Sequence, residues 1–237
     1  KDATALLTYL NREQYGDTPL FYGQYYNATP IEQKDGSPKY IKATVSTKYI
    51  AARQRGKVVY DEKNTTIFPR MYSNDESRNH PVYYKMWSGI KEGSDRKPTF
   101  AENLTYFFRY QVNHMYWRYF MWNFAGRQND IQSFGLNYSG YQPMSESNGT
   151  KDLLHGNWIT GINFIDAWRL GPQTDLPEDL ANNKGKNRLF CLPLLLGIAG
   201  LVFQIRRKPK DAFVVFLLFF MTGLAIVLYL NQPPCQP

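Results

Sequence analysis

The sequence predicts a mainly α-helical integral membrane fragment. Two transmembrane helices, at about 189–205 and 212–230, follow an aromatic-rich α+β region with a small β-hairpin or meander. Three observations predict this class. Of the 237 residues, 43% are hydrophobic and 16% are aromatic. The mean hydropathy is nevertheless only −0.49. The aliphatic residues are crowded into the last fifth of the chain. This composition excludes a disordered chain, a collagen and a coiled coil.

The two apolar segments are long enough to cross a membrane. Residues 189–205 and 212–230 are uncharged runs of 17 and 19 residues. As helices that rise about 1.5 Å per residue, they reach roughly 26 and 28 Å, close to the ~30 Å hydrocarbon core. The alternative is a helical hairpin buried in a large soluble protein. Because residues 213–220 are apolar on every face, hydropathy favours a transmembrane hairpin over 189–230.

The connection between these runs indicates an orientation. Residues 206–211 carry four cations, which the positive-inside rule places in the cytoplasm. Residues 1–188 and the tail 231–237 are then extracytoplasmic. Three further cations between residues 184 and 188 weaken this asymmetry, so the opposite orientation stays open. The chain begins without Met or a signal peptide, and we therefore expect an internal piece of a longer membrane protein.

Short elements are expected before residue 99. Residues 3–11 have the apolar spacing of a helix. Residues 40–68 are rich in β-forming residues on both sides of Arg55-Gly56, which predicts a hairpin or meander that turns there. Residues 73–97 are polar and contain Gly and Pro, which predicts a loop with one short helix near 82–87.

A long aromatic helix is predicted over residues 100–124. Thr99 and Glu102 have the spacing of a capping box at its start, and Gly126 follows its end. Between residues 106 and 122, nine of seventeen residues are aromatic. Such a helix suits a membrane surface, where Trp and Tyr are stable and Arg reaches phosphates, but it suits an aromatic protein core equally well.

Polar side chains form two strips on this helix. At about 100° per residue, Gln111, His114 and Arg118 share one face, and Arg109 and Asn113 form a second strip. Aromatic side chains cover the remaining surface.

A polar turn, Gly126-Arg-Gln-Asn-Asp130, follows the helix directly. A glycine cap followed by Arg, Asn and Asp is dense in hydrogen-bonding groups that suit sugar hydroxyls or phosphate. The alternative is a turn that satisfies its own polar groups, with Asp130 paired to Arg127 or capping the next segment. Composition alone favours this alternative.

Several kinds of site are excluded by the sequence. His80, His114 and His155 are too scattered for a local metal motif, two Cys make no four-cysteine site, and no nucleotide-binding or hydrolase motif is present. We therefore expect no metal and no cofactor. Interleaved aromatic and Arg residues also occur on single-stranded nucleic-acid surfaces, but nucleic acid is an improbable partner next to two membrane spans facing outward.

Five segments together resemble one known family. They are residues 9–17, 68–71, 114–132, 156–158 and 229–232, and the stretch from His114 through Gly126-Arg-Gln-Asn-Asp130 is the most specific. The chain is similar, over essentially its whole length, to the middle of a family of large bacterial multi-span membrane proteins related to an animal transmembrane protein O-mannosyltransferase. The resemblance implies a glycosyltransferase of the GT-C type in the bacterial inner membrane, with residues 1–188 facing the periplasm.

The resemblance also implies the substrates. The donor would be a polyprenyl-phosphate sugar, mannose-like, and the acceptors Ser or Thr of exported proteins. In such enzymes the catalytic carboxylate precedes the region matched here, so we expect no catalytic residue in this chain. Our own hypothesis for substrate binding assigns the donor phosphate, sugar or lipid to residues of the aromatic helix and the turn: Arg109, His114, Trp117, Arg118, Trp122, Arg127, Asn129 and Asp130.

Two other functions remain open. The main alternative is a non-catalytic, membrane-anchored module that binds glycan or lipid, or acts as a scaffold. A transporter segment would carry ionisable residues inside its spans, and 189–205 and 212–230 contain none.

Overall fold

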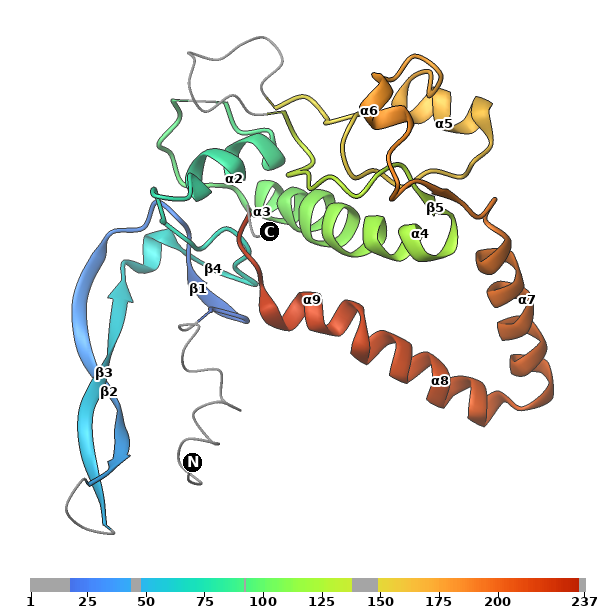
Figure 1. Ribbon diagram of the computed structural model, residues 1–237. Coiled ribbons are helices and arrows are strands. Elements are labelled where there is room, and N and C mark those ends of the chain that lie inside the picture. Colours follow the sequence, from blue (N-terminus) through green and yellow to red (C-terminus); the bar gives the residue numbers. More distant parts are fainter. Residues whose placement is uncertain (1–17, 44–47, 92, 138–148, 235–237) are drawn as a thin grey trace.

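The computed structural model describes residues 18–43, 48–91, 93–137 and 149–234 (Figure 1). The helix expected over 3–11 and the last three residues of the 231–237 tail lie outside these ranges. The described part combines small antiparallel sheets with helices, and two helical rods dominate its shape.

The N-terminal part contains two separate two-stranded sheets. One pairs β1 (Tyr22–Gln24) with β4 (Thr65–Ile67), and the other is a long ribbon of β2 (Pro30–Lys42) and β3 (Tyr49–Tyr60). A short 3-10 helix, η2 (Glu62–Asn64), joins β3 to β4.

The predicted hairpin exists, but its predicted turn is wrong. Arg55 and Gly56 lie inside β3, where Gly56 pairs with Asp35, and the pairing of the two strands extends to Lys42 and Tyr49. Arg55-Gly56 was interpreted as a turn because Gly is a common turn residue. The β2–β3 ladder accommodates these residues through register shifts, one of which lies between Asp35 and Pro38.

The long aromatic helix is present and begins as predicted. After α2 (His80–Ser88), the predicted short helix, the first rod consists of α3 (Phe100–Tyr106), η3 (Phe107–Trp117) and α4 (Arg118–Phe124). The capping box is complete, since Glu102 N–H donates to the Thr99 hydroxyl and Thr99 N–H donates to the Glu102 carboxylate. The sequence did not predict that η3 is a π-helix, a rare form that often marks functional positions.

An aromatic core fixes one side of this rod. The rings of Tyr84 and Tyr106 meet edge to face at 4.8 Å, and Trp87 packs on Tyr110 at 5.3 Å. Phe108 and Trp117 of the same rod are exposed instead. The two interpretations of this helix therefore describe different faces of it: a core face, and an exposed face with the chemistry of a membrane surface.

The apolar C-terminal segments form a helical hairpin. α7 (Leu192–Arg207) turns at Lys208 into α8 (Pro209–Thr222), which continues after Gly223 as α9 (Leu224–Leu230). α8 and α9 form a second rod that runs back toward α3 (Figure 1).

Only one of the two predicted spans has the length of a membrane helix. Residues 209–230 form a continuous candidate of 22 residues whose apolar window is not buried inside the protein. α7 is shorter than expected, at 16 residues. It starts three residues late because Leu189 N–H bonds to the carbonyl of Ala125, and Phe190 and Cys191 adopt left-handed backbone angles. The described residues therefore contain one candidate span, not two.

A loop-rich segment covers the end of the first rod. It holds α5 (Asn163–Leu170), α6 (Glu178–Ala181) and β6 (Asn187–Arg188), and β6 pairs with β5 (Gly126–Arg127) directly after α4. Through this pairing the segment is tied to both α4 and α7.

The end of the second rod is locked to the N-terminal part. Asn231 is fully buried, donates to the carbonyls of Pro19 and Pro69, and accepts from the Gln111 amide. The Arg70 guanidinium donates to the Leu228 carbonyl at the end of α9. A cation at a helix C-terminus interacts favourably with the helix dipole. Asn231, the first residue of the predicted 231–237 tail, is therefore buried and joins the end of α9 to the N-terminal part; we call this contact the joint.

Candidate functional site

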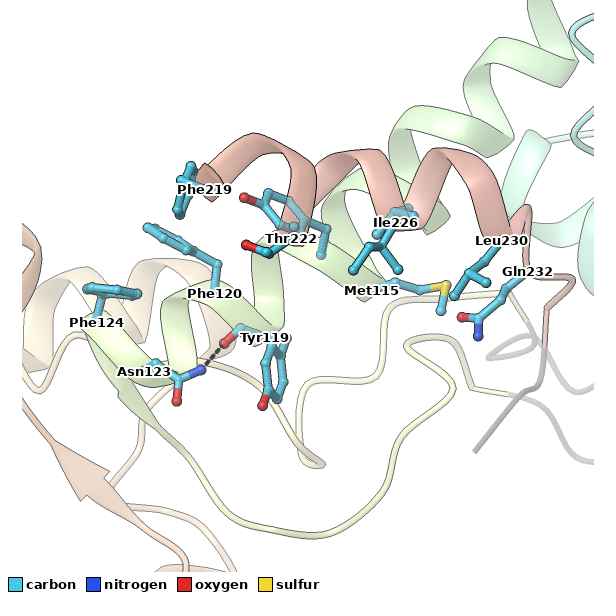
Figure 2. Close-up of a pocket in the computed structure, with 13 residues that line it drawn as sticks. Met115, Tyr119, Phe120, Asn123, Phe124, Phe219, Thr222, Ile226, Leu230 and Gln232 are labelled. Carbon is cyan, nitrogen blue, oxygen red and sulfur yellow. Dashed lines mark hydrogen bonds between the residues drawn. The ribbon is translucent and has the colours of Figure 1, made fainter. Parts of the chain in front are cut away.

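An apolar groove runs between the two rods. It has a volume of about 430 Å³ and lies between the η3–α4 side and the α8–α9 side. Its lining residues are Met115, Tyr116, Tyr119, Phe120, Asn123, Phe124, Phe219, Thr222, Gly223, Ile226, Val227, Leu230 and Gln232. Figure 2 shows Phe120 of the first rod close to Phe219 of the second, and Met115 close to Ile226 and Leu230. Its size and apolar lining match those of small-molecule sites.

Aromatic contacts shape one end of the groove. Phe120 stacks on Phe124 at 4.5 Å within α4 and meets Phe219 of α8 edge to face at 5.8 Å. Gly223 permits the close approach of the rods there, since an added Cβ would lie 2.8 Å from the ring of Tyr116. The few polar groups are the hydroxyls of Tyr116, Tyr119 and Thr222 and the amides of Asn123 and Gln232. Such a lining suits a long apolar chain.

The π-helix arranges one row of side chains along the inner face of the first rod. Tyr106 stacks on Tyr110 at 5.3 Å, and Tyr110 stacks on His114 at 5.7 Å, both at an interplanar angle of 21°. Since i→i+5 bonding puts more residues into each turn, side chains four apart come closer to one line. Arg118 ends the row, with its Nε donating to the His114 carbonyl.

The predicted polar strips face in different directions. Gln111, His114 and Arg118 point into the protein, where Gln111 reaches Asn231 and Arg118 reaches the carbonyl of Gly156. Arg109 and Asn113 are exposed.

Two of the predicted arginines meet at one tryptophan. The guanidinium carbons of Arg118 and Arg127 lie 4.7 and 5.7 Å from the ring centroid of Trp122. Neither makes an ion pair with a carboxylate of the described residues. The indole N–H of Trp122 is buried and has no partner within the described part of the chain. This cationic cluster (Arg118, Trp122 and Arg127) adjoins the groove, since Tyr119 lies 6.1 Å from the Trp122 ring.

The remaining predicted residues are held by the loops. The Asn129 amide donates to the Leu154 carbonyl and accepts from the N–H groups of Ile131 and Gly156. Asp130 is exposed, and its side chain lies next to Gly185. Trp117, on the rod itself, stacks on Phe120 with the ring centroids 5.4 Å apart. The Arg127 guanidinium donates to the Gly185 carbonyl. Arg127 and Asn129 are thus bonded to neighbouring loops, whereas the pairing of Asp130 with Arg127 that the alternative interpretation names is not found among the described residues.

Asp152 organises the loop that faces the cluster. Its carboxylate accepts from the Ser133 hydroxyl, from the N–H groups of Leu154 and His155, and lies 3.1 Å from His155 Nδ1. Burial opposes the charge, but the hydrogen bonds together lower the pKa of Asp152. This carboxylate fixes the loop that presents the Gly156 carbonyl to Arg118.

A substitution at Gly156 tests how firmly the cluster is seated. Gly156 has a φ of 56°, and an added Cβ would lie 2.6 Å from the Ile131 carbonyl and 3.1 Å from Arg118 Nη1. Gly156→Ala is expected to destabilise the protein by roughly 2–4 kcal/mol, combining left-handed strain with a backbone clash. Gly89→Ala is the matched control, because Gly89 has a φ of 77° and nothing within 4 Å. Thermal unfolding in detergent measures both, and equal losses would contradict the clash.

His114 is expected to make stability depend on pH. Burial, followed by the charge of Arg118, lowers its pKa from the ordinary 6.5 to about 3. Folding therefore favours the neutral ring. This contribution is full above pH 6.5 and is lost as pH falls from 6.5 toward 3.

The measurement compares thermal midpoints of the wild type and His114→Phe between pH 6.5 and 4.5. The variant keeps an aromatic ring but cannot titrate, so its midpoint should fall less. His80, whose pKa burial also lowers, supplies part of the remaining slope. Glu102, with a pKa of about 2, contributes only below its ordinary value of 4.5. Equal slopes in the two proteins would contradict the role of His114.

The sequence did not reveal the groove. The spacing of Met115, Tyr119 and Phe120 showed an aromatic surface, but nothing in the sequence showed that α8 and α9 fold back across it. The residues of the cationic cluster could be predicted, because Arg118, Trp122 and Arg127 stand out in the sequence as cations among aromatic residues.

Comparisons with known proteins add one finding. A model of a family of unknown function (DUF8416) matches residues 16–108, less than half of the chain. The matched range ends within η3, so Met115–Phe124, the 126–130 turn and α7–α9 lie beyond it. No curated protein and no solved structure matches the chain.

Proposed function

We propose that the chain is part of a membrane glycosyltransferase that moves a mannose-like sugar from a polyprenyl-phosphate donor to Ser or Thr of exported proteins. The observation that carries the proposal is the apolar groove between the aromatic rod and the only candidate membrane span of the described residues. A groove open along a membrane helix is accessible to a lipid in the bilayer. We assign it to the isoprenoid chain of the donor.

The proposal includes the membrane topology. α7 provides a second crossing, the connection around residue 208 faces the cytoplasm, and residues 1–188 face the periplasm of a bacterial inner membrane. The exposed apolar surface along α7 is compatible with lipid, since Leu196 is 72% exposed. At about 24 Å, by 1.5 Å per residue, a 16-residue helix needs local thinning of the bilayer or help from flanking residues.

The cationic cluster would hold the donor phosphate. The guanidinium groups of Arg118 and Arg127 both lie near the Trp122 ring, and neither is paired with a carboxylate of the described residues. Tyr119, which lines the groove, lies next to Trp122. A phosphate bound there would have its lipid chain directed toward the groove. Guanidinium groups bind phosphate strongly because their N–H donors match its oxygens.

The chemistry requires one group from outside the chain. The acceptor hydroxyl attacks the anomeric carbon, a carboxylate outside the chain takes the hydroxyl proton, and the bond from the anomeric carbon to the phosphate oxygen breaks. Polyprenyl phosphate leaves with the electron pair. Arg118 and Arg127 would stabilise the charge that develops on that phosphate.

A non-catalytic lipid- or glycan-binding module remains the second candidate. It is favoured by the hydrogen bonds of Arg118, Arg127 and Asn129 to backbone carbonyls, which give these side chains a structural role without any substrate. Under this reading the groove still binds lipid, but no sugar is transferred.

The deciding experiment deletes the parent gene and analyses the intact glycopeptides of exported proteins. Complementation with wild type should restore Ser/Thr glycans, Arg127→Ala should not, and Arg127→Lys should restore them in part because it keeps the charge but not the planar fork. Arg78→Ala, at an exposed position before α2 and outside the hypothesised site, is the control for general damage. An unchanged glycoproteome in the deletion strain would reject the transferase and leave the binding module.

A further inference from the structure

The short helix α5 exposes two large apolar side chains on one face. Phe164 is 76% exposed and Trp168 is 88% exposed, and residues four apart lie on the same side of a helix. This exposure is among the highest of any large apolar side chain in the described residues. The proposed glycosyl transfer makes no use of them.

The opposite face of α5 is held firmly. The buried Asp166 carboxylate accepts from the N–H and hydroxyl of Thr160 and from Gly161 N–H. Arg169 lies 3.6 Å over the Trp158 ring. The helix is thus fixed in place, and the outward position of Phe164 and Trp168 follows from that anchoring.

The start of α5 touches the segment that leads into α7. A Cβ on Gly161 would lie 2.9 Å from Arg188 Cβ and 3.1 Å from the Phe190 ring, so these groups are in contact with the turn before α5. Phe190 is 50% exposed, and the apolar surface continues from it to Leu192, which is 57% exposed. The turn before α5 therefore lies against the segment that leads into the apolar surface of the helical hairpin.

We infer that α5 is a membrane-interface anchor, whose Phe164 and Trp168 insert at the boundary between headgroups and acyl chains beside the start of α7. Trp and Phe on one face, with the exposed Arg188 against the turn before the helix, suit this layer: the rings enter the apolar edge and the guanidinium reaches lipid phosphate. This inference rests on the membrane attachment in the proposed function but is independent of glycosyl transfer.

The test places a nitroxide label at single positions of the full-length protein in vesicles of phosphatidylcholine and phosphatidylglycerol, after Cys191→Ser and Cys235→Ser. Labels are attached through Phe164→Cys and, separately, Trp168→Cys, so that one anchor residue always remains. Both positions are exposed, so neither change disturbs the core. Collision rates with oxygen, which partitions into lipid, and with a nickel chelate, which stays in water, give the depth of each label.

Two reference labels calibrate the result. Leu218→Cys on α8, 63% exposed, reports on the lipid interior, and Glu76→Cys, an exposed position before α2, reports on water. The labels at 164 and 168 are expected to be intermediate, with oxygen accessibility above that at 76. Nickel accessibility equal to that at 76 would overturn the anchor, as would protection from both reagents, which would indicate a protein partner. If the label at 218 is itself in water, membrane attachment fails and the anchor fails with it.

Discussion

Replacing Asn231 with alanine is expected to lower the free energy of unfolding by about 3–5 kcal/mol, because three polar groups each lose a hydrogen bond to this buried side chain. Those groups are the carbonyls of Pro19 and Pro69 and the Gln111 amide. Asn231 also has a φ of 43°, a left-handed conformation that Asn tolerates better than Ala. The thermal midpoint in detergent should fall by roughly 6–20 °C for a chain of this size.

Asn231→Gly separates the two causes. Glycine accepts the left-handed backbone but removes the same three hydrogen bonds, so it should keep most of the loss. A variant as stable as wild type would show that the hydrogen bonds do not hold the joint. Because this joint sets the position of α9 against η3, both variants should also weaken lipid binding in the groove.

Asn103→Ala is expected to have an effect of similar size. The fully buried Asn103 amide accepts from the N–H groups of Arg70 and Met71 and donates to the Phe68 carbonyl. The loss removes all three bonds in the interior and should cost about 3–5 kcal/mol. Phe68 has a φ of 54°, a strained backbone that this side chain holds in place.

The matched control is Asn113→Ala, an exposed asparagine on the same rod. Its effect should stay within about 0.5 kcal/mol. Thermal unfolding in detergent compares the two variants directly. A similar small change in both would contradict the role given to Asn103.

Local signals in the sequence predicted the parts of the fold that depend on local chemistry. The capping box at Thr99 and Glu102 fixed the start of the aromatic helix, and the Gly after residue 125 marked its end. The prediction of a turn at Arg55-Gly56 was wrong because these residues are part of a paired strand, next to a register shift between Asp35 and Pro38. No local pattern in the sequence indicated the π-helical form of η3.

The site was predictable only where residue chemistry was distinctive. Arg118, Trp122 and Arg127 stood out as cations among aromatics, and the structure brings them together. The groove depends on a contact between Phe120 and Phe219, which are about a hundred residues apart. Asn103 and Asn231 were missed for the same reason, since a buried asparagine and an exposed one look alike in a sequence.

The central claim, that the groove binds the isoprenoid chain of a lipid donor, is tested most directly by photo-crosslinking. The full-length protein in vesicles is illuminated with a polyprenyl phosphate that carries a diazirine in its chain, and the labelled peptides are mapped. We expect labelling within 115–124 and 219–232 that unlabelled polyprenyl phosphate suppresses.

The variant Ile226→Trp, which fills the groove, should reduce this labelling about tenfold, a loss of ~1.4 kcal/mol in binding. Ile198→Trp, the same change at an exposed position of α7 outside the groove, should leave it unchanged. Labelling confined to other segments, or undiminished by Ile226→Trp, would contradict the account.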